Sequence, residues 1–540
     1  MRRFNLLDEP WIWVLDKEGK SRELSLKEVF YQAADLRGLV NELPTLDVAI
    51  LRLLLAILHA SLARDVKDYE SGINLWRELW NYGLPSEKVC KYLEQWRDRF
   101  WLFDDKYPFY QVAFNKDKEP TPDMEPSGAK LNGEISESAH QPRLFPVRTG
   151  NDVNNLLFSE AVRWLIYNIA FDDNACNSGG VLKALEVKSS IGLSWLGRLG
   201  LLWVTGRTLV ETLLFNFVLL DPNNSFIHWE KGNALWEINS MTGRRRRKVI
   251  PPKSQLEILT FPSRRMLLKL EGGYVTGCKL FGGNSIEDNA FSEQMTVWGK
   301  KETKNSTEYY PKPHDPSKQL WRDFGALTGG DSMKQYEGVG VLKWLEKLVG
   351  ENCLYSMPIT MCIAGVVYKP RYKSSVEDVF FDSLSFNASL LNKLGSKWNR
   401  GISNVLVDTE EAVDSVGTLA VKLIKASGDK EDERNNRKEL SATMKRGRDT
   451  AKSEAYFRLD LQFREWLEGI DPEKDQLDTK CDKWRDTVKK TLQKLGDELV
   501  KAAGVKAFIG HDGMNTSIAY NNFLTSINKT LQKVEVKNNE

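Results

Sequence analysis

The sequence lacks the motifs that the common hydrolase classes need. Its 540 residues contain only five histidines and six cysteines, and no two cysteines are three positions apart. Zinc ribbons and knuckles need closely spaced cysteine pairs, so cysteine alone builds no metal site here. The phosphate-binding GxxxxGK[ST] pattern, the GxSxG nucleophile turn and the zinc-binding HExxH pattern are all absent. These absences exclude the common nucleotide hydrolases, α/β-hydrolases and zinc peptidases, and we expect no metal or other cofactor.

A strong net charge and a long apolar run are also missing. The 76 basic residues nearly balance the 74 acidic ones, giving a net charge of +2, which excludes a protein that coats a polyanion with its whole surface. The longest charge-free apolar run, Cys353–Tyr368, is about 16 residues long, short of the roughly 20 that a spanning helix needs. The N-terminus has no apolar stretch typical of a signal peptide. We therefore expect a soluble, cytoplasmic protein with reduced, buried cysteines and no membrane partner.

Bulky apolar residues are plentiful, and their distribution predicts the domain organisation. The 17 Trp, 23 Phe and 16 Tyr exclude a disordered chain. Residues 221–385 mix short strand-like pieces with turns, which favours an α+β class over an alternating βαβ array. Beyond residue 386 the only proline is Pro472, and apolar residues recur with helical spacing in four stretches. We predict a mixed α+β domain over 1–385 and an antiparallel four-helix bundle over 386–540. The four stretches include Val413, Tyr456, Trp484 and Tyr520.

Local signals predict several elements of the first domain. Trp11–Leu15 is typical of a strand that returns after a turn at Gly19, and Ser25 with Glu28 forms a helix-capping box. From Thr45 to Ala63 the apolar period predicts a long buried helix. Further helices are predicted over 69–81, 86–100, 157–170 and 208–219. Residues 115–152 are rich in proline and predict a long binding loop, because long loops in compact domains usually carry function.

Two His-Asp pairs leave an enzymatic alternative open. His314-Asp315 and His511-Asp512 are the pairs a metal-dependent HD nuclease or phosphohydrolase would use. Such a site also needs further ligands at helical spacing, and the sequence around these pairs offers none. We interpret both pairs as loop residues. His59, on the predicted long helix, is interpreted as a core or interface residue.

Basic clusters and a glycine-rich turn are the candidate nucleic-acid contacts. Lysine and arginine placed on phosphates release counterions, which favours binding. A solvated surface is the competing interpretation of each cluster. The densest run is Arg244, Arg245, Arg246, Arg247 and Lys248, a weaker one is Arg264-Arg265, and Lys300 and Lys301 follow Trp298. Asn177, Ser178, Gly179 and Gly180 form a turn whose backbone can approach another surface, since glycine has no Cβ; an ordinary loop is the alternative.

The N-terminal sequence resembles a known family. Phe4–Ile12, Ser25–Phe30 and Glu42–Ala60 are similar to the CasA family, the large subunit of the type I-E CRISPR surveillance complex Cascade. The resemblance continues loosely through Tyr107–Gln111, Glu211–Asn216, Pro311–Pro316 and the four helical stretches. It implies a non-catalytic protein that recognises the PAM, the short motif beside a DNA target, from the minor-groove side.

The resemblance also assigns roles to residues. It implies a glycine loop at Asn177–Gly180, a lysine finger at Lys301 with Lys300 adjacent, and a duplex-splitting wedge at Tyr372, Lys373 and Ser374. The wedge lacks the glutamine of the family pattern. The tip of the long loop, Leu144, Phe145, Pro146 and Val147, would contact the 5′ end of the guide RNA and a neighbouring subunit.

The implied partners are the CRISPR guide RNA, target double-stranded DNA and the other Cascade subunits, namely the backbone, 5′-handle-binding and small subunits. The C-terminal bundle would contact the small subunits and the displaced strand, and would help to recruit the helicase-nuclease effector. A purely structural scaffold remains a third hypothesis.

Overall fold

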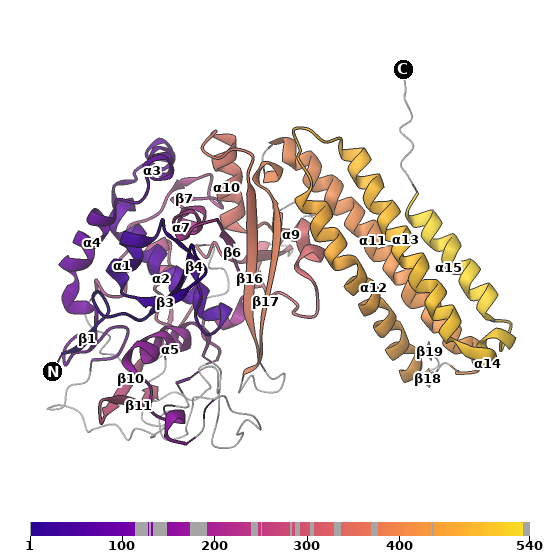
Figure 1. Ribbon diagram of the computed structural model, residues 1–540, viewed down its shortest axis with the longest axis horizontal. Coiled ribbons are helices and arrows are strands. Elements are labelled where there is room, and N and C mark those ends of the chain that lie inside the picture. The colour runs from indigo at the N-terminus through magenta and orange to yellow at the C-terminus, as the bar shows by residue number, and fades with distance from the viewer. Residues whose placement is uncertain are drawn as a thin grey trace. The chain divides into compact units, whose positions relative to one another are not determined.

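The chain separates into two compact units, each described by itself (Figure 1). The first contains residues 1–318, 335–354 and 359–383, and the second contains 319–334, 355–358 and 384–540. Both come from a computed structural model, in which helices and strands are mixed as the α+β prediction expects. The structure describes residues 2–113, 128, 131–132, 148, 150–172, 192–238, 247–249, 251–280, 283–286, 292–302, 307–328, 336–368, 376–391, 393–430, 432–434 and 437–532.

A three-stranded sheet opens the first unit and confirms the local signals. β2 (Ile12–Asp16) lies between β3 (Ser21–Leu24) and β4 (Leu36–Leu39). Ser25 then caps α1 (Leu26–Gln32): its hydroxyl accepts from the Glu28 N–H at 3.3 Å, and its own N–H donates to the Glu28 carboxylate at 2.8 Å. The predicted capping box is therefore formed on both sides.

The core of the first unit surrounds α2 (Pro44–Leu62). Nearly all of its residues are buried, and it packs against α4, α5, α7 and α8. By length and composition it is the one described helix that could cross a membrane, but most of it is buried inside the unit, as in the core helix of a globular domain. These four helices are α4 (Ser86–Gln95), α5 (Phe158–Phe171), α7 (Leu209–Asn216) and α8 (Gln255–Leu259), and α7 also contacts α3 (Tyr69–Tyr82) and α10 (Gly340–Gly350). The predicted helices are confirmed, but α4 ends at Gln95 and α7 ends at Asn216, before the predicted ends at 100 and 219.

Small sheets complete the first unit. The apolar run that ends at Tyr368 forms β16 (Pro358–Tyr368), a strand rather than a helix, which lies between β6 (Leu201–Thr205) and β17 (Val376–Asn387). β13 (Val297–Glu302) lies between β14 (Thr307–Lys312) and β15 (Tyr336–Glu337). The remaining pairs are β1 (Arg3–Asn5) with β5 (Trp101–Phe103), β7 (Leu220–Asp221) with β8 (Ile227–His228), β9 (Arg247–Val249) with β12 (Asn284–Ile286), and β10 (Met266–Glu271) with β11 (Tyr274–Leu280).

The second unit is helical, and each predicted amphipathic stretch lies mainly in one of its long helices (Figure 1). α11 packs against α12, α13 and α15. The helices are α9 (Phe324–Thr328), α11 (Lys393–Ala426), α12 (Ala442–Glu468), α13 (Leu477–Ala502), α14 (Gly504–Ile509) and α15 (Thr516–Thr530), with a short hairpin of β18 (Asp432–Arg434) and β19 (Arg437–Glu439).

The division of the chain differs from the predicted single domain over 1–385. The chain passes from the first unit to the second for the last time between residues 383 and 384, close to the predicted boundary. Two earlier segments, 319–334 and 355–358, also belong to the helical unit. Trp321 explains the first of these: it is fully buried, stacks on Phe463 at 4.6 Å, and its indole N–H donates to Asp460 at 2.8 Å. A contact between residues so far apart in sequence leaves no local signal.

Candidate nucleic-acid interface

The predicted lysine finger lies on the β13–β14 hairpin. Antiparallel pairing sets Lys300 opposite Tyr309 and Lys301 opposite Glu308. At the base of the hairpin Trp298 is fully buried, and its indole N–H donates to the carbonyl of Glu293 at 3.1 Å. Lys301 is four residues beyond Val297, about 13 Å along the strand at the usual rise. The buried Trp298 therefore anchors the base of a hairpin that holds Lys301 near its far end.

The two neighbouring lysines have different surroundings. The ammonium of Lys300 lies 3.4 Å from the Glu337 carboxylate, which also binds Lys343 at 3.3 Å. Burial would raise the pKa of Glu337, but Lys343 and Lys300 together hold that pKa below its ordinary value. Lys301 is exposed and forms no ion pair with another described residue. The alternation of the strand therefore leaves Lys301 as the lysine available to a ligand.

Arg264 joins the two residues that flank segment 173–191. Its Nε atom lies 2.5 Å from the Asp172 carboxylate, and its Nη2 atom donates to the Gly192 carbonyl at 2.6 Å. Arg264 is only 1 % exposed, so its charge is used inside the protein. The interpretation of Arg264 as part of a surface basic cluster is therefore wrong. An ion pair this deeply buried fixes geometry, because removing one partner leaves an uncompensated charge.

A second buried ion pair continues this network to the lysine hairpin. Arg52 on α2 binds both oxygens of Glu293, at 2.8 and 2.9 Å. Trp195 links the two pairs: its backbone N–H donates to the hydroxyl of Ser263 at 3.0 Å, and its indole N–H donates to Glu293 at 3.3 Å. We call Arg52, Asp172, Trp195, Ser263, Arg264 and Glu293 the buried frame. It connects the residues beside segment 173–191 to the base of the β13–β14 hairpin.

One cavity lies where the predicted elements begin and end. It has a volume of about 580 Å³, and its lining includes Gly192, Arg198, His314, Tyr368 and Phe380. Gly192 follows the segment with the predicted glycine loop, Tyr368 precedes the segment with the predicted wedge, and His314 follows β14. The Tyr368 hydroxyl also donates to the carbonyl of Phe171 at 2.5 Å. Residues at the ends of the segments that contain the three predicted elements therefore meet at one cavity.

Most of the predicted contact residues themselves lie outside the described residues. Arg247 and Lys248 are described only as backbone, at the start of β9, opposite Asn284 and Ser285 of β12. Outside the description are Asn177, Ser178, Gly179 and Gly180; Tyr372, Lys373 and Ser374; Leu144, Phe145, Pro146 and Val147; and Arg244, Arg245 and Arg246. The roles of all these residues stay predictions.

The histidines do not assemble a metal centre in the described parts of the chain. The ring of His314 packs against Phe380 in a tilted arrangement, with centroids 5.5 Å apart, and the Nδ1 atom of His511 lies 3.1 Å from the carboxylate of Asp512. No group of three metal-ligating side chains occurs among the described residues, so the HD alternative is not supported. His59 is buried against Phe217, and burial lowers its pKa to about 3, which confirms its interpretation as a core residue. The five described cysteines are buried, and none of them forms a disulfide with another described residue.

The fold and the site define a class of protein. It is an α+β protein with a mixed unit and a helical unit, and the β13–β14 hairpin, which carries the exposed Lys301, is joined to the buried frame. The family model of CRISPR-associated protein Cse1 matches residues 5–495. CRISPR-associated protein CasA/Cse1 of Thermus thermophilus is 30% identical over 353 residues, 65% of this chain and 64% of that relative's length. The chain belongs to the Cse1 family, also called CasA.

Solved structures extend the similarity to nearly the whole chain. Thermobifida fusca Cse1 covers 98% of this chain and 98% of its own, with a TM-score of 0.83 and 29% identity. A chain of a CRISPR RNA-guided surveillance complex covers 98% of this chain and 100% of its own, with a TM-score of 0.60 and 16% identity. The second likeness shows the fold alone.

Proposed function

We propose that this protein is the non-catalytic large subunit of a type I-E CRISPR RNA-guided surveillance complex, in which it recognises the PAM of target double-stranded DNA. Family membership supports the role in the complex. The observation that carries PAM recognition is the 580 Å³ cavity, because residues beside the glycine-loop, lysine-finger and wedge segments line it together. The buried frame joins Asp172 and Gly192, which flank the first of these segments, to the base of the β13–β14 hairpin.

The chemistry of these groups suits tolerant recognition in the minor groove. That groove presents a degenerate pattern of acceptors, which a lysine ammonium and backbone N–H groups can contact without selecting one base pair. In this proposal Lys301 supplies the ammonium and Asn177–Gly180 supply the backbone. Tyr372, Lys373 and Ser374 separate the strands beside the PAM, with the tyrosine ring stacking in place of a glutamine. Guide pairing then supplies the remaining specificity, since strand exchange is nearly balanced in energy.

The other partners are assigned by the same proposal. Leu144–Val147 contact the guide RNA and a neighbouring subunit, and Arg244–Lys248 provide a further nucleic-acid patch. The C-terminal helices act as a four-helix bundle that contacts the small subunits, the displaced strand and the helicase-nuclease effector. Exposed lysines and arginines on α12 and α13 support contact with a strand: Lys445, Arg446, Arg448, Lys483 and Lys490.

The test compares Lys301→Ala with Lys17→Ala in the assembled complex. Lys17 is a surface lysine paired with Asp35, so its loss controls for charge. We expect Lys301→Ala to weaken binding to a PAM-bearing duplex by about 1–3 kcal/mol and to change binding to a PAM-free duplex little. Titration by electrophoretic mobility shift measures both. Equal affinity of the two variants contradicts the assignment, and it favours the scaffold hypothesis if Phe145→Ala alone prevents assembly.

A further inference from the structure

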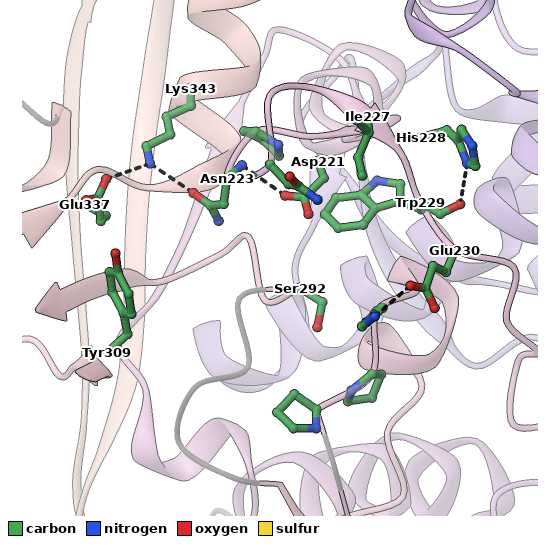
Figure 2. Close-up of a pocket in the computed structure, with 15 residues that line it drawn as sticks. Asp221, Asn223, Ile227, His228, Trp229, Glu230, Ser292, Tyr309, Glu337 and Lys343 are labelled. Carbon is green, nitrogen blue, oxygen red and sulfur yellow. Dashed lines mark hydrogen bonds and ion pairs between the residues drawn. The ribbon is translucent and has the colours of Figure 1, made fainter. Parts of the chain in front are cut away.

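A second, larger cavity of the first unit has no role in the proposed PAM site. It has a volume of about 660 Å³, within the usual range for ligand sites, and Figure 2 shows its walls. The walls come from the β7–β8 hairpin, the segment at Pro251–Lys253, Ser292, β14, β15 and α10. The chemically distinctive members of its lining are Asp221, Trp229, Glu230, Lys253, Ser292, Tyr309, Glu337 and Lys343.

Ser292 presents a buried hydroxyl to this cavity. The residue is 5 % exposed, and its Oγ atom has no hydrogen-bond partner among the described residues. Figure 2 shows Ser292 in the lining of this cavity, together with Trp229 and Tyr309. Leaving a buried polar group unpaired is costly, so structures usually supply a partner from protein, water or ligand. This hydroxyl marks a position where a ligand atom would gain a hydrogen bond.

Two of the carboxylates in the lining form ion pairs with lysines, and the third forms a different contact. Lys343 binds Glu337 at 3.3 Å, and Lys253 binds Glu230 at 2.9 Å. The Asp221 carboxylate instead accepts from the backbone N–H of Asn223 at 3.0 Å. Burial raises the pKa of Asp221, although Lys343 acts in the opposite direction. A cationic group brought next to Asp221 would offset this loss of hydration.

An aromatic face lies beside that carboxylate. The register of the hairpin pairs Asp221 with Ile227, Trp229 directly follows the end of β8, and Asp221 and Trp229 both line the cavity (Figure 2). The indole N–H of Trp229 already donates to the carbonyl of Val218 at 2.8 Å. The N–H edge of the indole is thus used in a hydrogen bond within the protein. The π-face of the ring, which is the surface that attracts cations, remains for a ligand.

We propose that this cavity binds an arginine side chain carried by a basic segment of a protein partner. The guanidinium stacks on Trp229 and donates hydrogen bonds to the Asp221 carboxylate and the Ser292 hydroxyl. Its flat shape and five N–H donors serve all three contacts at once, which a lysine ammonium cannot match. Nucleic acid fits less well, because three carboxylates and two ammonium groups line the cavity in the described structure.

The direct test uses matched peptides and the purified full chain. The probes are acetyl-Gly-Gly-Arg-Gly-Gly-amide and its citrulline and lysine counterparts, measured by saturation-transfer NMR. Citrulline keeps the size of arginine but loses the charge, so we expect the citrulline peptide to bind at least about tenfold more weakly. The lysine peptide should fall between them. Equal binding of the arginine and citrulline peptides overturns the proposal, as does preferential competition by a five-nucleotide oligothymidine.

Variants separate the cavity from the PAM site. Asp221→Asn should abolish the preference for arginine over citrulline, whereas Asp65→Asn, which changes an exposed carboxylate, should leave it intact. Ser292→Ala removes a hydroxyl that has no described partner, so it should retain the fold and weaken the arginine peptide severalfold. Unchanged binding in folded Ser292→Ala and Asp221→Asn would exclude this site. Lys301→Ala should bind the peptide normally, so PAM recognition and this proposal can fail independently.

Discussion

The two units are stabilised in different ways. The first unit buries whole ion pairs: the side chains of Arg52 and Glu293 are 3% and 1% exposed, and those of Arg264 and Asp172 are 1% and 7% exposed. In the described part of the second unit even the well-buried pair of Arg485 leaves its partner Asp408 27% exposed. Buried pairs contribute little net stability but fix geometry, since either partner alone is unfavourable. Buried ion pairs therefore position the residues that flank loops in the first unit, whereas apolar packing between helices dominates in the second.

The largest expected effect comes from breaking the buried frame. Arg264→Leu leaves Asp172 buried without its cation and should destabilise the first unit by about 3–5 kcal/mol. Urea unfolding followed by hydrogen exchange at Ser194–Thr205 measures the loss. Adding Asp172→Asn to Arg264→Leu should recover part of it, because the stranded charge is gone. A loss below about 1 kcal/mol in the single variant would show that this ion pair contributes no more to stability than an exposed surface ion pair does.

Trp321 offers the corresponding test in the second unit. Trp321→Phe keeps an aromatic ring against Phe463 but loses the hydrogen bond to Asp460. A hydrogen bond to a charged group contributes about 1.5–3 kcal/mol, so the helical unit should lose about 2 kcal/mol. Hydrogen exchange in α12 measures this, and amides of the buried frame serve as the internal control. Equal loss of protection in both units would contradict their separate stabilisation.

The pH dependence of stability should also differ between the units. Burial lowers the folded-state pKa of His59 to about 3, below the ordinary 6.5 of an unfolded histidine. Protons therefore bind the unfolded state first, and the first unit loses stability as pH falls below 6.5. Asp47 opposes this: burial raises its pKa to about 6, so its contribution falls as pH rises from about 4 to 6.

The measurement compares the wild type with His59→Leu. Between pH 7 and pH 5.5 the wild-type first unit should lose about 1 kcal/mol more than the variant, as judged by urea midpoints. Parallel pH profiles of the wild type and the variant would mean that folding does not lower the pKa of His59.

The smallest effect is expected at a surface ion pair of the helical unit. Arg458 on α12 lies 2.8 Å from Glu498 on α13, and both side chains are partly exposed. Solvent screens such pairs, so Arg458→Ala should change the free energy of unfolding by less than about 1 kcal/mol. Denaturant unfolding at low and high salt measures this. A loss as large as that of Arg264→Leu would remove the contrast between the two units.

Sequence patterns predicted the helices and strands more accurately than they predicted which distant residues contact one another. Ser25 and Glu28 form their capping box because both groups lie within one turn. The same reasoning failed for Arg264, whose partner Asp172 is 92 positions away along the chain. It also gave no partner for Lys300, whereas the pairing of β13 with β15 brings Glu337 to that lysine. The unpartnered hydroxyl of Ser292 carries no sequence signal, because only the surrounding walls make it unusual.

The sequence by itself determined the helices, the N-terminal strands and the family of this protein. These follow from hydrogen bonds and apolar periods within a few residues, and from motifs that remain contiguous. The tertiary structure decided which charges are buried, which of the two lysines pairs with Glu337, where Trp321 packs and where cavities form. Each of these depends on burial, and burial is created only when segments distant in the chain exclude water together.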